Sequence, residues 1–316
     1  MSKHQPVKLL PVKIPKPWGQ EIWFSAIEDR GESQVLVEDK AVTLSNYLRD
    51  YPGATGDQEL LLLKILDPLP EAVRGELYFE VHAEKEEVYV VTHVDRSAWP
   101  DGIGEIRFGM NQRARAKAGS DDLFRQQFRD AVAAYEQIRR RIDAGEEGLT
   151  SLEAERRSAM EAFTERRSLI EGDVVRVPRW TPHALQHGVR VVEFQTPTYE
   201  RYIISFAQKV LTQDHWDTEA AVRQMHLDTP ESGADERIEE NIERIARCGG
   251  FNVWRVQQPD SLKLPNVPYA IAMTLGPARI GDLQLTAEES CLIPSAAVAH
   301  TSITSDSTVL LAAPGL

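Results

Sequence analysis

Two short segments, far apart along the chain, constrain its fold and chemistry more than any other feature. The first, Gly75–Val91, and the second, Gly172–Ala184, both contain β-like runs. Glu80 and His82 are two positions apart, so on a strand both side chains point to the same face. Two carboxylates and two imidazoles are a ligand set that suits a divalent metal. The segments therefore predict one metal site, with the candidate ligands Glu80, His82, Glu86 and His183.

The composition of the chain limits its partners. Its 316 residues can form one large domain or two ordinary ones, and 42% of them are hydrophobic, which is adequate for a packed core. The formal net charge of −13 argues against nucleic-acid binding, because a phosphate backbone needs a basic face. An anionic substrate would have to be attracted by a local cluster of cations.

Cysteine usage and hydropathy predict a cytoplasmic protein. The two cysteines, Cys248 and Cys291, give neither zinc-ligand spacing nor a disulfide framework, as is typical of a reducing compartment. No run approaches the length of about 18 apolar residues that would span a membrane. The basic N-terminus lacks the apolar core of a signal peptide. We therefore expect no membrane contact.

Residues 1–111 are expected to form mostly strands and turns, with helical capacity confined to Val42–Leu48. Short β-rich runs bounded by Pro, Gly and Asp lie at Glu21–Phe24, Leu61–Leu66 and Val88–Val91. A helical hairpin is then predicted at about 116–168. Its first helix covers Asp121–Ala144, where apolar residues recur near helical spacing, and its second begins at the capping signal of Thr150 and runs to about Arg167.

The second half of the chain is expected to be mainly strands around a helical segment. We predict weak helical character over Thr212–Glu231, a linker at Pro230–Asp235, and a helix at Ile238–Cys248 with Gly249 and Gly250 as its C-cap. Strand-rich stretches on either side of this segment suggest two β domains. The expected strands are Val174–Val177, Val189–Phe194, Phe251–Val256, Tyr269–Gly276 and Leu310–Ala313.

The two metal-site segments resemble the paired signatures of the cupin superfamily. Gly172, Pro178 and His183 match the pattern G-x5-P-x-G-x2-H, with Trp180 where the pattern has glycine. The closer resemblance is to the type I mannose-6-phosphate isomerases, which are double cupins. It covers residues 16–205 apart from the hairpin, and the segments that carry it are Lys16–Trp23, Leu62–Asp67, Glu80–Lys85, Glu86–Tyr89, Glu171–Leu185 and Glu193–Tyr202.

This resemblance implies a mainly β fold, a double cupin of β-barrel or jelly-roll domains with an inserted helical hairpin and short linking helices. The metal-binding cupin domain would span residues 1–207, with the insertion at about 116–168. Residues 208–250 would form a linking segment with a helix, and residues 251–316 a second, metal-free cupin-like domain. A monomer or a homodimer is expected.

The resemblance also implies a function, a metal-dependent aldose–ketose isomerase that interconverts mannose 6-phosphate and fructose 6-phosphate or a related phosphosugar. One divalent metal, with zinc as the first candidate, would be held by Glu80, His82, Glu86 and His183. Glu87 competes with Glu86 for the third ligand position, and the family's spacing favours Glu86 because Tyr89 then fits.

The implied roles of the cations are catalysis by Arg201 and Lys85, and binding of the phosphosugar by Lys64 and Arg201. The residues do not identify the general base, for which Glu193, Glu86 and Glu87 remain open candidates.

Departures from the family pattern keep other functions open. Glu80 stands where the family has Gln, and Ala83 where it has Pro. The extra carboxylate would hold the metal more tightly and weaken its Lewis acidity. The same ligands would also suit a cupin dioxygenase with Fe²⁺ or Mn²⁺. A non-catalytic, sugar-binding double cupin is the remaining alternative.

Overall fold

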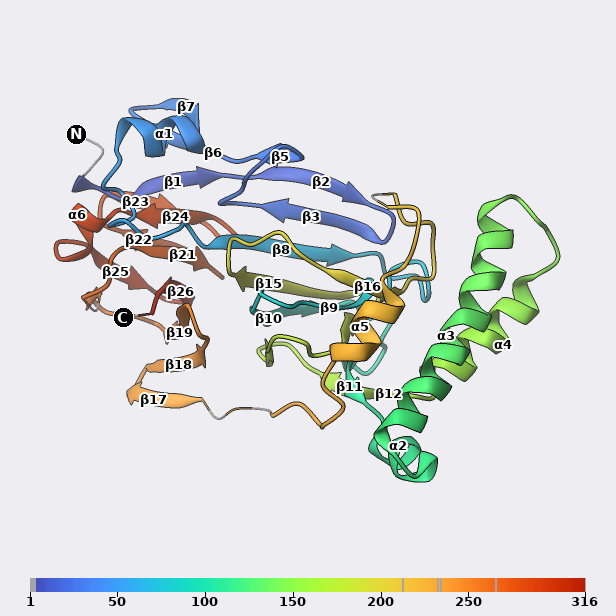
Figure 1. Cartoon of the computed structure of the whole chain (residues 1–316). Coiled ribbons are helices and arrows are strands. Elements are labelled where there is room, and N and C mark those ends of the chain that lie inside the picture. The colour runs from blue at the N-terminus through green and yellow to red at the C-terminus, as the bar shows by residue number, and fades with distance from the viewer. Residues whose placement is uncertain (1–3, 212, 232, 234, 265, 316) are drawn as a thin grey trace.

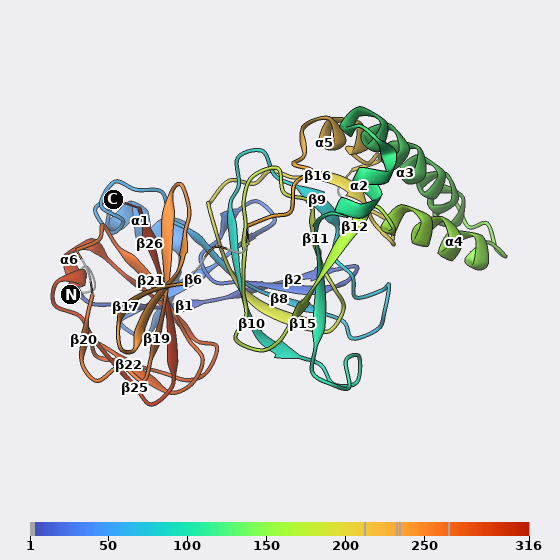
Figure 2. The ribbon, with the colours of Figure 1, turned by 90° about the horizontal axis from the view of Figure 1, so that it is seen from below.

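The structure is a computed structural model that describes residues 4–211, 213–231, 233, 235–264 and 266–315. It is mainly β, and its sheets form two sandwiches that lie side by side (Figures 1 and 2). Neighbouring strands within each sheet are antiparallel. Among the described residues, no helix is both long enough and apolar enough to cross a membrane.

The first sandwich pairs a six-stranded sheet with a five-stranded sheet. The six-stranded sheet contains, in spatial order, β13 (Val174–Val177), β10 (Glu87–Val94), β15 (Val189–Gln195), β8 (Leu62–Pro68), β3 (Gly19–Trp23) and β2 (Val12–Lys16). The five-stranded sheet contains β12 (Thr164–Leu169), β11 (Gly104–Met110), β14 (His183–Leu185), β9 (Phe79–Val81) and β16 (Tyr202–Ser205).

The second sandwich pairs a nine-stranded sheet with a four-stranded sheet. The nine-stranded sheet contains β17 (Glu236–Glu239), β18 (Ile242–Arg247), β19 (Phe251–Gln257), β26 (Thr308–Pro314), β21 (Ala270–Thr274), β24 (Ser290–Ile293), β1 (Val7–Leu10), β6 (Gln34–Val37) and β7 (Lys40–Thr43). The four-stranded sheet contains β20 (Leu262–Lys263), β25 (Ser302–Ser305), β22 (Ala278–Ile280) and β23 (Leu283–Leu285), and a separate ribbon joins β4 (Ile27–Glu28) to β5 (Gly31–Glu32).

The N-terminal strands cross the domain boundary expected from the sequence. Strand β1 pairs with β24, with Lys8 opposite Cys291, so the beginning of the chain belongs to the sheet of the second sandwich. Helix α1 (Leu44–Asp50) follows β7, close to the expected helical stretch at 42–48. The first and last parts of the chain are therefore joined by a common sheet.

Strand periodicity gives the six-stranded sheet two different faces. Leu63 and Phe194 pack in a buried cluster with Met273 and other residues of the nine-stranded sheet, and this cluster joins the two sandwiches. Lys64 and Glu193 lie opposite each other in the ladder, and Tyr89 lies opposite Glu193 on the other side. Because side chains alternate along a strand, these three form a row on the face toward the five-stranded sheet.

The predicted helical hairpin is confirmed, and it projects beyond the first sandwich at the end opposite the second (Figures 1 and 2). It comprises α2 (Gln112–Ala118), α3 (Asp121–Asp143) and α4 (Thr150–Glu161). Ser120 caps α3 by accepting a hydrogen bond from the Leu123 amide. The apolar face of α3 is buried, and Phe128 packs edge-on against Phe79 of β9, 6.4 Å between ring centroids.

The expected end of the second helix is wrong, because α4 stops at Glu161 and Thr164–Leu169 forms β12. This charged run has little local preference of its own. It pairs along β11, with Leu169 opposite Gly104, and tertiary pairing decides its conformation.

The helix predicted at Ile238–Cys248 is also wrong, because β17 and β18 occupy this region. Ile242 and Ile245 are three residues apart, which imitates helical spacing. In the structure Ile242 belongs to the core of the second sandwich, and Ile245 to the cluster between the sandwiches. A strand buried on both faces explains the pattern. Helix α5 (Thr218–Gln224) lies within the expected weakly helical region, and the expected linker at 230–235 lies partly outside the described residues.

Candidate metal centre

Two buried histidines from different strands face each other inside the first sandwich. His82 follows β9 directly, and His183 begins β14. The two strands are neighbours, with His183 opposite Glu80 in the ladder. Sheet pairing therefore joins the two distant segments, and the imidazole centroids lie 5.1 Å apart.

Hydrogen bonds to backbone carbonyls set the tautomer of both imidazoles. His82 Nδ1 lies 2.9 Å from the Glu200 carbonyl oxygen, and His183 Nδ1 lies 2.9 Å from the Thr181 carbonyl oxygen. A carbonyl only accepts, so each Nδ1 carries the hydrogen and each Nε2 presents a lone pair in the neutral ring. Both Nε2 atoms are buried and have no hydrogen-bond partner among the described residues. This orientation is typical of metal-ligating histidines.

Two carboxylates complete the cluster. Single ligand atoms of Glu80, His82 and His183 all lie within 4.8 Å of one another. Glu80 Oε1 and Glu87 Oε1 are each 3.6 Å from His82 Nε2, and Glu87 Oε2 is 3.2 Å from His183 Nε2. The second carboxyl oxygen of Glu80 is buried without a hydrogen-bond partner among the described residues. These four side chains fit a divalent cation, because its coordination would satisfy the orphaned atoms.

The electrostatics of the two histidines differ. Burial, together with Lys85, holds the pKa of His82 well below its usual value, so this ring is neutral. Burial also disfavours the charged form of His183, but the carboxylates of Glu87 and Glu80 outweigh this effect and raise its pKa. The same negative charge that favours a proton on His183 would favour a metal cation.

The structure does not bring Glu86 to this cluster, so its expected place among the ligands is wrong. Glu86 Oε2 accepts a hydrogen bond from the Gly249 amide at 2.9 Å, on the side of the second sandwich. Glu87 is the buried neighbour that faces the histidines, and only 2% of its surface is exposed. Adjacent side chains of an extended chain point to opposite faces, so only one of this Glu-Glu pair can reach the site.

The three predicted cations, Lys64, Lys85 and Arg201, line the pocket beside the cluster. Both lysines are already close to carboxylates. Lys85 forms an ion pair with Glu87. Lys64 Nζ donates to Glu193 Oε1 at 3.3 Å and lies 4.0 Å from Glu21 Oε2. The guanidinium of Arg201 lies 4.3 Å from the ring centroid of Tyr78.

Two pocket carboxylates have displaced pKa values in opposite directions. Burial raises the pKa of Glu193 to about 8, against the opposing effect of Lys64. Burial alone would raise the pKa of Glu21 as well, but Lys64 and Lys16 lower it to about 2. Of these two carboxylates, Glu193 is the one that can exchange a proton near neutral pH, which makes it a candidate for acid–base chemistry.

Sequence reasoning missed several residues of the pocket. Glu200 orients His82 through its carbonyl, and its carboxylate accepts hydrogen bonds from the Ala83 and Glu84 amides. Its position next to Arg201 was the signal that could have identified it. Glu21 and Lys16 were also missed, although both lie in the Trp-Gly segment that supports the family resemblance.

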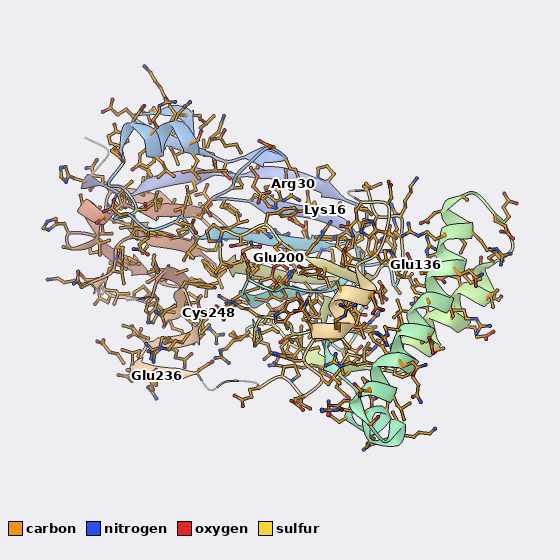
Figure 3. The ribbon with its side chains drawn as sticks, viewed as in Figure 1. Lys16, Arg30, Glu136, Glu200, Glu236 and Cys248 are labelled. Atoms are coloured by element: carbon orange, nitrogen blue, oxygen red, sulfur yellow. The ribbon has the colours of Figure 1, made fainter. Side chains whose placement is uncertain are left out.

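The pocket beside the cluster is small. It encloses about 50 Å³, and its lining includes Glu80 and Glu87 of the cluster as well as Lys16, Arg30 and Glu200, which Figure 3 labels. There the Arg30 guanidinium lies 3.6 Å from the ring centroid of Tyr199 and also stacks on Trp23. This contact joins the β4–β5 ribbon to the loop before Arg201.

Comparisons with known proteins bear on the fold. No protein-family model matches the chain, and no curated protein matches its sequence. Solved structures match it over nearly its whole length. Mannose 6-phosphate isomerase from Bacillus subtilis is 17% identical, with a TM-score of 0.69 and 98% of this chain and 99% of that chain covered.

Two structures from Salmonella typhimurium cover 99% of this chain and 100% of their own. A mutant phosphomannose isomerase is 13% identical with a TM-score of 0.73, and a mannose 6-phosphate isomerase bound to its substrate F6P and zinc is 12% identical with a TM-score of 0.72. The predicted fold is confirmed: the chain has the mainly β, double-cupin fold of mannose-6-phosphate isomerases.

Proposed function

We propose that the protein is a zinc-dependent isomerase that interconverts mannose 6-phosphate and fructose 6-phosphate or a closely related phosphosugar. The observation that carries the proposal is the convergence of Glu80, His82, Glu87 and His183, with both Nε2 lone pairs directed into one cluster. The match to structures of such isomerases, one of them with zinc and F6P bound, supports the same reading.

The four side chains would hold one divalent cation, with Glu87 in the place first given to Glu86. Two imidazoles and two carboxylates suit zinc. When bound, the cation supplies Lewis acidity, which polarises the oxygens at C1 and C2 of the sugar. Lys85 neutralises Glu87 and fixes its orientation through their ion pair. Lys85 would thus act on the reaction through a ligand rather than on the sugar.

Glu193 is our candidate for proton transfer. In the aldose-to-ketose direction its carboxylate takes the proton from C2 while O1 gains a proton, which gives an enediol. O2 then loses its proton and Glu193 returns a proton to C1, so the atoms balance without a redox partner. Its raised pKa, about 8, suits a group that accepts and returns a proton at neutral pH. Lys64 keeps its carboxylate in place.

Arg201 is our candidate for the phosphate end of the sugar. It lines the same pocket as Glu80 and Glu193, and its planar guanidinium can bind a phosphate through two hydrogen bonds. The ring of Tyr78 supports it from one side. In this structure Lys64 is paired with the carboxylates of Glu193 and Glu21. We retain Lys64 as a second candidate for contact with the phosphosugar.

A coupled isomerase assay on mannose 6-phosphate tests the proposal. We expect turnover that is abolished by a chelator, restored by Zn²⁺ and independent of O₂. Metal bound in stoichiometric amount without turnover would reject the isomerase and favour a sugar-binding protein. Consumption of O₂ with a metal-dependent product would favour the dioxygenase.

A further inference from the structure

Glu86, which does not face the metal centre, lies between two residues that do. Lys85 and Glu87 flank it, and both are buried in the pocket. Its backbone continues the ladder of β10, since the Thr196 amide donates to the Glu86 carbonyl at 3.2 Å and the Glu86 amide donates to Thr196 Oγ1 at 3.3 Å. Any displacement of Glu86 would therefore move the start of β10 and the ligand beside it.

The carboxylate of Glu86 is held by the turn between β18 and β19 of the second sandwich. This turn is closed by a hydrogen bond from the Cys248 amide to the Phe251 carbonyl, 2.8 Å, and presents the Gly249 amide to Glu86 Oε2. A Cβ atom added at Gly249 would lie 2.9 Å from the same oxygen. The close approach thus depends on glycine at position 249.

The same carboxylate also faces the turn that leads to His183. Glu86 Oε2 lies 4.0 Å from Arg179 Nη2. In this turn the Trp180 amide donates to the His82 carbonyl at 2.6 Å. Glu86 therefore lies where three segments meet: the start of β10, the turn before His183 and the β18–β19 turn.

From this geometry we infer that Glu86 is a positioning residue, through which the β18–β19 turn of the second sandwich holds the start of β10 and keeps Glu87 at the metal centre. The inference rests on the metal centre of the proposed function. It gives the second sandwich a role at a site to which its described residues contribute no ligand. Partners that orient metal ligands typically change metal affinity by about 10- to 100-fold when removed, and the indirect contact of Glu86 places it near the lower value.

The test is the affinity of the metal-free full chain for Zn²⁺, measured by competition with a chromophoric chelator. Glu86→Ala removes the hydrogen bond, and Gly249→Ala displaces the carboxylate from the opposite side. We expect each to weaken Zn²⁺ binding about tenfold. The double variant should be no weaker than either single variant, because both changes break one contact.

Two variants serve as matched controls. Glu86→Gln retains an oxygen that accepts from the Gly249 amide, and Gly250→Ala adds a methyl group next door whose nearest contact is Thr196 Cγ2 at 3.9 Å. Both should bind Zn²⁺ as the unchanged protein does. If Glu86→Ala and Gly249→Ala lower only the unfolding temperature and leave Zn²⁺ affinity unchanged, the contact only stabilises the packing of the two sandwiches. The inference is then overturned.

The outcomes separate this inference from the proposed function. Zn²⁺ affinity that responds as expected, in a protein without isomerase activity, would reject the isomerase and leave the role of Glu86 standing. Equal weakening by Glu86→Ala and Glu86→Gln would overturn the positioning role, because the charge and not the hydrogen bond would then matter. Absence of Zn²⁺ binding by the unchanged protein would overturn both.

Discussion

The two sandwiches are built alike, from two facing sheets, but their interiors differ. The first encloses charged side chains, including Lys64, Glu87 and Glu193, all less than 10% exposed. The core of the second contains apolar residues such as Cys291 and Leu311. Burying charges is unfavourable unless they are paired or bind a metal. The charged site therefore makes the core of the first sandwich less stable, whereas the core of the second sandwich is stabilised by apolar packing.

Ion pairs inside the first sandwich, and packing of its six-stranded sheet on the second sandwich, offset the cost of the buried charges. Within the first sandwich Lys64 is paired with Glu193 and Lys85 with Glu87. The opposite face of the same six-stranded sheet packs on the nine-stranded sheet through residues such as Phe194 and Met273. One sheet thus carries the site on one face and the joint to the second sandwich on the other. Four variants would break or sharpen this contrast.

The largest effect is expected from a histidine of the first sandwich. His183→Ala removes a candidate ligand and should lower Zn²⁺ affinity by at least about 100-fold, with loss of turnover, since even indirect partners of a metal change its affinity by up to about that factor. Metal content after dialysis and the isomerase assay would measure this. His300→Ala is the control, because His300 is exposed in the second sandwich. Equal metal loss in both variants would contradict the proposed centre.

A substitution at Glu193 should separate catalysis from metal binding. Glu193→Gln is expected to lower kcat by about 10²- to 10⁴-fold, the usual contribution of a general acid–base group, while Zn²⁺ content stays unchanged. Glu239→Gln, on the exposed strand β17, is the control. Turnover that survives the change at Glu193 would remove this residue from proton transfer.

The carboxylate of Glu193 should also make kcat/KM depend on pH, with lower values at lower pH. The pKa of Glu193 is raised to about 8, so as the pH falls below that value a growing fraction of the group is protonated and cannot accept a proton. A bound cation would lower this pKa, because it favours the ionised form. In the unchanged protein kcat/KM should therefore fall as pH falls, with the midpoint at or below pH 8. A profile that is flat from pH 5 to pH 9 would exclude this carboxylate as the base.

A core substitution in the second sandwich should change stability alone. Leu311→Ala is expected to lower the free energy of unfolding by about 2–5 kcal/mol through the cavity it leaves, with Zn²⁺ affinity unchanged. Denaturant unfolding with a parallel Zn²⁺ titration would measure both. Leu211→Ala, at a position that is 72% exposed, should stay within about 0.5 kcal/mol. Loss of Zn²⁺ affinity in Leu311→Ala would show that the two interiors are not separable.

The smallest effect is expected at the Arg30–Tyr199 contact in the pocket lining. Tyr199→Ala removes the stacking on Arg30, which is worth about 0.5–1 kcal/mol at an exposed position, or about two- to fivefold in an equilibrium. The rate at which a chelator strips Zn²⁺ should rise by about that factor. Tyr199→Phe keeps the ring and should leave the rate unchanged, and an unchanged rate in Tyr199→Ala would mean that the contact does not close the pocket.

Several local elements of this protein could be predicted from the sequence alone. Short β-rich runs located β8, β10 and β15, and apolar residues near helical spacing located α3. The two-residue spacing of Glu80 and His82 placed both on one side of the chain. These patterns are readable because a continuous apolar run, or the period that burial of one helix face imposes, involves residues close in sequence.

Features that depend on distant partners could not be predicted from local patterns. The choice of Glu87 over Glu86 depends on which face of β10 meets His183, and on the Gly249 amide that receives the other carboxylate. β18 was mistaken for a helix because it is buried on both faces, and β12 forms because β11 lies beside it. Burial and pairing are properties of the folded chain, so a local pattern that two structures can satisfy is resolved only when the sheets assemble.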